Sequence, residues 1–126
     1  MTKEKMTELK LKNVPSLLFD ESEREGKVSA RTAFNAMKRG DAAGKELVDK
    51  YIFYLAEGIT NMINIFQPEI LCIGGGVCNE KDYLLVPLME KVNHEQYTRA
   101  NSKKTKVVIA ELGNDAGIIG AACLGL

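Results

Sequence analysis

The chain has 126 residues, a length at which a domain buries roughly 65% of its unfolded surface and can form one hydrophobic core. Seventeen basic residues balance seventeen acidic ones, which argues against a general nucleic-acid binder because such proteins carry a basic surplus. The apolar runs are far shorter than the ~20 residues of a membrane span. Three cysteines and no apolar stretch behind Met1 favour a reducing compartment. We therefore expect a cytoplasmic globular protein without membrane contact.

The first 28 residues are rich in charged side chains. Apolar residues between positions 6 and 11 predict a short helix, and the polar run 20–27 predicts a loop. Ser29 is a good helix N-cap, and Gly40 is a good helix stop. We therefore expect a helix and a polar loop first, and a second helix after Ser29.

A long helix is predicted from about residue 42 to residue 67. Its apolar residues recur at intervals of three and four, which places them on one face. They are Val48, Ile52, Leu55, Ile59, Met62, Ile63 and Phe66. Asp41 precedes this helix as an N-cap residue and Pro68 ends it.

Two short apolar runs, Ile70–Ile73 and Val107–Ala110, are typical of strands that are covered on both faces. A helix is predicted between them from about 82 to 97, and Pro87 means that it either starts near Val86 or has an irregular first turn. A connection of this kind makes the two strands parallel. Two strands are too few for a stable sheet, so the sequence indicates a piece of a larger α/β fold.

Three consecutive glycines, Gly74, Gly75 and Gly76, follow the first strand. A ligand can approach the backbone closely at glycine, and ligands of open α/β sheets lie beyond the carboxyl ends of strands. The alternative is a tight turn that needs glycine for its geometry alone. The dinucleotide-binding fingerprint is rejected because Asn79 stands where its third glycine is required, and segment 40–46 fails the P-loop spacing.

Other polar residues have structural explanations. Asp115 starts a last predicted helix and is more typical of an N-cap than of a catalytic base. His94 lies in a polar helical segment and is interpreted as a surface residue. Cys72, Cys78 and Cys123 lack zinc-site spacing and are predicted to be small buried hydrophobic residues.

Three blocks together resemble the ROK family (repressor, open reading frame, kinase), and bacterial glucokinases within it. The blocks are Asn64–Glu69, Ile73–Val77 and Leu112–Ala122. The resemblance implies an actin-like, ribonuclease H-like ATPase fold of two lobes, with ATP and sugar in the cleft between them. It also implies that Gly74, Gly75 and Gly76 contribute to the adenosine-binding part of the site.

The departures from that family are equally informative. The Asp-x-Gly-Gly-Thr phosphate loop, the catalytic Asp of an Asn-Asp pair, the sugar-binding Glu-x-Gly-His and the Cys-x-Cys-Gly zinc motif are all missing. The resemblance therefore implies the C-terminal part of an ATP-dependent hexose kinase, a glucokinase, whose full-length form uses ATP and Mg²⁺. We expect this chain to be inactive alone, to lack a zinc site and any catalytic residue, and to bind adenine nucleotide weakly and hexose only with the missing part.

Within that interpretation, residues 29–126 form the C-terminal part of the kinase domain, and the last helix, 115–125, is assigned to the missing lobe. Two alternatives stay open. One is a fragment of a ROK transcriptional repressor, and the other is a stand-alone oligomerisation or interaction module. Unpaired strand edges recruit other chains, so a homo-oligomer is expected.

Overall fold

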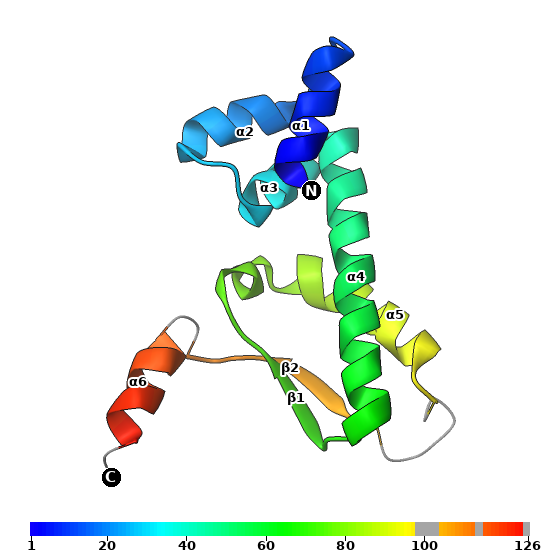
Figure 1. Cartoon of the computed structure of the whole chain (residues 1–126), viewed down its shortest axis with the longest axis vertical. Helices are drawn as coiled ribbons and strands as arrows, with labels where there is room; N and C mark the ends of the chain where they lie inside the picture. The colour runs from blue at the N-terminus through cyan, green and yellow to red at the C-terminus, as the bar shows by residue number, and fades with distance from the viewer. Residues whose placement is uncertain (98–103, 113–114, 125–126) are drawn as a thin grey trace. The chain divides into compact units, whose positions relative to one another are not determined.

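A computed structural model of the chain describes residues 1–97, 104–112 and 115–124 (Figure 1). The chain forms two compact units, residues 1–54 and residues 55–126. The boundary falls inside helix α4 (Ala42–Phe66), so this helix contributes to both units. Among the described residues, no helix combines the length and the apolar character that crossing a membrane requires.

The first unit is helical. Its helices are α1 (Thr2–Leu11), α2 (Leu17–Glu25), α3 (Ala30–Lys38) and the first part of α4. The prediction of a loop over 20–27 is therefore wrong, because most of this run lies in α2. The Ser16 hydroxyl accepts a hydrogen bond from the Leu18 N–H at 3.2 Å at the start of α2, and Gly26, with φ +65°, ends the helix.

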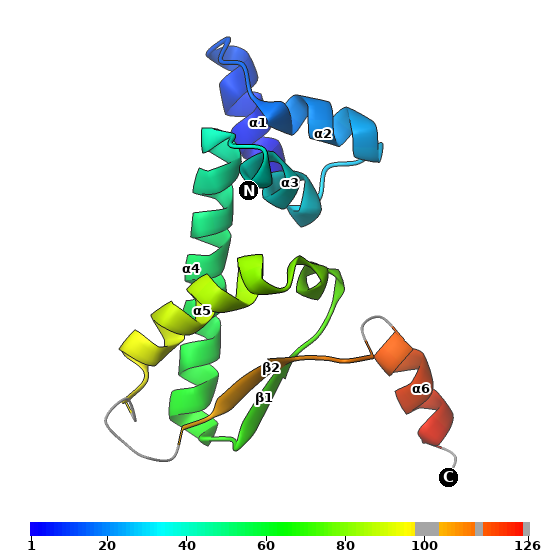
Figure 2. The same ribbon diagram turned by 180° about the vertical axis from the view of Figure 1, so that it is seen from behind.

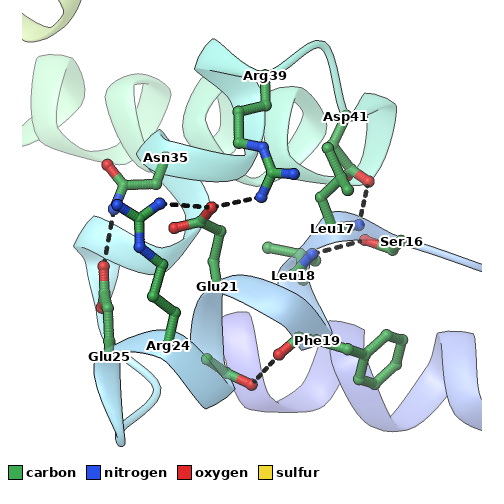
Figure 3. Close-up of polar contacts among 11 residues, drawn as sticks. Ser16, Leu17, Leu18, Phe19, Glu21, Arg24, Glu25, Asn35, Arg39 and Asp41 are labelled. Atoms are coloured by element: carbon green, nitrogen blue, oxygen red, sulfur yellow. Dashed lines mark hydrogen bonds and ion pairs between the residues drawn. The ribbon is translucent and has the colours of Figure 1, made fainter.

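A buried carboxylate explains why the sequence of α2 predicts a polar loop instead of a helix. The Glu21 side chain is only 1% exposed and accepts a hydrogen bond from the Arg39 guanidinium at 2.7 Å, with Arg24 at 3.8 Å (Figure 3). The hydrogen bond from Arg39 lowers the pKa of Glu21, and the charges of Arg24 and Arg39 act the same way against the opposing effect of burial. The charged position thus belongs to the buried face of α2, where an apolar residue is expected.

The predicted helix starts at Ser29 and Asp41 are confirmed. The Ser29 N–H donates to the Thr32 hydroxyl at 3.0 Å in a capping box. Asp41 caps two helices. One carboxylate oxygen accepts a hydrogen bond from the Gly44 N–H of α4 at 2.7 Å, and the other accepts one from the Leu17 N–H of α2, also at 2.7 Å (Figure 3). One side chain therefore fixes the start of α4 beside the start of α2.

Gly44 allows α3 and α4 to pack closely. A Cβ atom at this position would lie 2.7 Å from the Met37 backbone nitrogen and 2.9 Å from the Ala36 Cβ atom. Both distances are shorter than real Cβ contacts allow. The glycine in the rejected P-loop match is therefore required for helix packing.

We expect Gly44→Ala to lower the free energy of unfolding by ~1–3 kcal/mol, because the Met37 backbone cannot yield to the added methyl group. Gly58→Ala is the matched control in the same helix, where nothing lies within 4 Å of an added Cβ. It should raise the free energy of unfolding by ~0.5–1 kcal/mol. Urea denaturation measures both changes, and equal effects at the two positions would contradict this account.

The second unit joins the rest of α4 to a small sheet (Figures 1 and 2). Its further elements are strand β1 (Ile70–Ile73), the 3₁₀ helix η1 (Gly76–Glu80), α5 (Asp82–Glu95), strand β2 (Lys106–Ile109) and α6 (Ala116–Cys123). Strands β1 and β2 pair in parallel, with Ile70 opposite Lys106 and Ile73 opposite Ile109. The predicted parallel pair is confirmed. Helix α5 begins at Asp82 and includes Pro87, so the alternative start near Val86 is wrong.

The apolar core of the second unit comes from α4, η1, α5 and β2. Its buried hydrophobic side chains are Ala56, Ile59, Ile63, Cys78, Leu84, Leu88, Val92 and Val107. The prediction that β1 is covered on both faces is wrong for this chain, because Ile70 and Cys72 are exposed while Leu71 and Ile73 are half-buried. This alternation shows that only one face of β1 is covered by the described residues.

Candidate functional site: the glycine turn after β1

The three glycines form an exposed turn that follows β1 and ends at Gly76, the first residue of η1. The Ile73 carbonyl, just before the turn, accepts hydrogen bonds from the Ala110 N–H at 2.8 Å and from the Cys78 thiol at 3.3 Å. The Cys78 N–H in turn donates to the Gly75 carbonyl at 3.1 Å. These contacts fix the turn at the carboxyl end of the parallel strand pair. The sequence located the turn but did not indicate the support from Ala110, which directly follows β2.

The three glycines differ in what the fold requires of them. Gly75 has φ +94°, a backbone conformation that residues other than glycine rarely adopt. Gly74 and Gly76 lie outside the left-handed region, and a Cβ atom at either would meet nothing within 4 Å. The turn geometry therefore accounts for one glycine and leaves the other two without a structural reason in this chain.

The cysteines differ as well. Cys78 is buried as predicted, and burial, followed by the nearby Cys72, raises the pKa of its thiol. The thiol therefore stays protonated and supports the turn as a hydrogen-bond donor. Cys72 and Cys123 are exposed, so the prediction that they are buried is wrong. Cys72 lies on the uncovered face of β1, and Cys123 belongs to α6, whose described side chains are all exposed.

The remaining candidate residues do not join the turn in a catalytic cluster. Asp115 occupies the N-cap position of α6 but makes no capping hydrogen bond with its side chain, and residues 113–114 of its motif lie outside the described residues. His94 is exposed near the end of α5, as expected of a surface residue. Within the described part of the chain, no three His, Cys, Asp or Glu side chains are grouped as metal ligands.

The model of the ROK family matches residues 11–126. The chain is 37% identical to a glucokinase of Halalkalibacterium halodurans over 81% of its length and 31% of that protein. It is 36% identical to a glucokinase of Thermotoga maritima over 86% of its length and 34% of that protein. An N-acetyl-D-glucosamine kinase of Pasteurella multocida is 30% identical over 79% of the chain and 32% of its own length.

These curated relatives are all much longer than the chain, which spans about a third of their length. Among solved structures, a protein of Cytophaga hutchinsonii assigned as a sugar kinase has a TM-score of 0.64 at 23% identity. This likeness covers 78% of the chain and 32% of that protein. It confirms the predicted fold class, a mixed α/β part of the actin-like, ribonuclease H-like ATPase fold.

Proposed function

The chain belongs to the ROK family, and we propose that it is the carboxyl-terminal part of a cytoplasmic, ATP-dependent hexose kinase of the glucokinase type. The identity to two glucokinases supports this choice over other sugar kinases and over a ROK repressor. In the proposed full-length enzyme, ATP would transfer its γ-phosphoryl group to a hexose hydroxyl in the presence of Mg²⁺.

The proposal rests on Gly74 and Gly76, two exposed glycines for which this chain shows no structural requirement. Since neither position needs glycine for its backbone angles or for packing in this chain, the absence of side chains there fits a ligand that approaches the backbone. The turn lies where a parallel strand ends, which is the usual ligand position in open α/β sheets. We assign Gly74, Gly75 and Gly76 to the adenosine half of the nucleotide site.

On this proposal, the chain contributes to catalysis by holding the nucleotide in position. Phosphoryl transfer depends on holding the nucleotide and on stabilising charge on the moving phosphate. The turn offers backbone to an adenosine, but the chain has no Asp-x-Gly-Gly-Thr phosphate loop. We assign none of the described residues to Mg²⁺.

ATP added to the labelled 126-residue chain should shift the backbone amides of residues 73–79, with a dissociation constant on the order of 1 mM, about −4 kcal/mol. Gly74→Ala should weaken binding more than fivefold without loss of stability, because its methyl group has space in the free protein and blocks only the ligand. Gly58→Ala serves as the control and should bind ATP like the parent chain. The titration is followed by NMR, and unchanged binding by Gly74→Ala would remove the turn from the site.

The chain alone should not phosphorylate glucose. Every group that stabilises the moving phosphate belongs, on this proposal, to the part of the enzyme that the chain lacks. A coupled assay for ADP with purified chain, ATP, Mg²⁺ and glucose should give the rate of the blank. Glucose-dependent ADP formation that persists after removal of host kinases would show that catalytic residues lie on this chain.

We also propose that the chain self-associates. Ile70 of β1 is 61% exposed, and Ile118 of α6 is 72% exposed. Exposed apolar side chains and unpaired strand edges both favour association. Light scattering over micromolar concentrations should give a mass above that of one chain. A constant mass of 13.9 kDa would contradict self-association.

A further inference from the structure

A pocket in the first unit lies between the end of α1 and one face of α2. Its volume of about 420 Å³ is within the range of small-molecule sites, roughly 300–1,000 Å³. All of its lining residues fall between positions 9 and 23, so the pocket belongs to one unit and is separate from the glycine turn. Its lining includes Leu9, Lys10, Val14, Pro15, Phe19 and Glu23.

The end of α1 builds one wall of this pocket. Asn13 has φ +53° and ends the helix in a Schellman motif. In this motif the Asn13 N–H donates to the Lys10 carbonyl at 3.2 Å, and the Val14 N–H donates to the Leu9 carbonyl at 2.9 Å. Such an ending brings an apolar residue just past the helix against the last turn. Leu9 and Val14 therefore form a fixed apolar surface with Lys10 beside it.

One face of α2 builds the other wall. Phe19 and Glu23 are four residues apart, so they lie on the same side of the helix. Figure 3 shows the Phe19 ring pointing away from the buried Glu21 carboxylate. The hydrogen bond from the Leu17 N–H to Asp41 holds the start of α2 in place. The wall is therefore present without a ligand.

The pocket carries two opposite charges that the chain leaves without partners. Within the part of the chain that the structure describes, neither the Lys10 ammonium nor the Glu23 carboxylate forms an ion pair or a side-chain hydrogen bond. Other charged side chains of the unit are paired, for example Lys12 with Glu8 at 2.6 Å. Lys10 and Glu23 line the same pocket but do not neutralise each other, so both charges are available to a ligand.

We propose that this pocket binds a free amino acid with an apolar side chain. The side chain packs on Leu9, Val14 and Phe19, the α-carboxylate pairs with Lys10, and the α-ammonium pairs with Glu23. A free amino acid carries both charges beside one apolar group, whereas the backbone inside a peptide is neutral. Because exposed ion pairs contribute little, the dissociation constant should be on the order of 1–10 mM.

An NMR titration of the full chain with L-phenylalanine at neutral pH, without nucleotide, tests the pocket independently of the proposed kinase function. The amide shifts of residues 9–15 and 19–23 should saturate. Phenylpropionate lacks the ammonium group and phenylethylamine lacks the carboxylate. Each should therefore bind about two- to fivefold more weakly than phenylalanine, the loss expected for one exposed ion pair.

Two variants assign the charges to their partners. Lys10→Gln should weaken the binding of phenylalanine and phenylpropionate but not of phenylethylamine, whereas Glu23→Gln should weaken that of phenylalanine and phenylethylamine but not of phenylpropionate. Both should keep the fold, because neither side chain has a partner in the described chain. Lys3→Gln and Asp20→Asn are the matched controls, since they remove the same charges from exposed positions of α1 and α2 outside the pocket.

Three results would each overturn the proposal. The first is the absence of a saturable shift up to ~50 mM phenylalanine. The second is equal binding of all three ligands by the parent chain, which describes apolar contact without charge recognition. The third is equal weakening of phenylalanine binding by Lys10→Gln and Lys3→Gln, which describes an effect of the overall charge of α1.

Discussion

The parallel pairing of β1 with β2 is the constraint on which the second unit depends. Hydrogen bonds extend the pairing past both ends of β1, from the Lys106 N–H to the Glu69 carbonyl at 2.9 Å and from the Ala110 N–H to the Ile73 carbonyl at 2.8 Å. The Thr105 hydroxyl adds a bond of 2.6 Å to the Pro68 carbonyl. Because parallel strands need a crossover, η1 and α5 must leave from the carboxyl end of β1, which is where the glycine turn lies.

The first unit depends on helix ends more than on strand pairing. The Asp41 carboxylate satisfies one N–H group of α2 and one of α4, and such groups have no partner inside their own helix. The Glu21–Arg39 pair then joins α2 to the end of α3. The Glu21–Arg39 contact joins consecutive helices, whereas Asp41 joins α2 to α4 past the intervening α3. Polar contacts between helices therefore determine how the unit is connected.

Periodicity predicted the parts of the fold that depend on a single segment. The spacing of apolar residues and Pro68 located α4, and the glycine turn was found because β1 and the glycines are adjacent in the sequence. Prediction failed where the decisive contact comes from another segment. Helix α2 was missed because Glu21 is buried against Arg39, and the role of Gly44 depends on the backbone of α3.

Different kinds of unsatisfied surface in the second unit require different kinds of partner. On the proposed function, the exposed backbone at Gly74 and Gly76 suits a ligand that comes close to peptide groups. Helix α6 differs, since Ile118 and Leu124 are 72% and 89% exposed and are stabilised by apolar contact. Because a nucleotide and an apolar protein surface are recognised by different forces, we propose that these two places are occupied independently in a chain that spans about a third of its relatives' length.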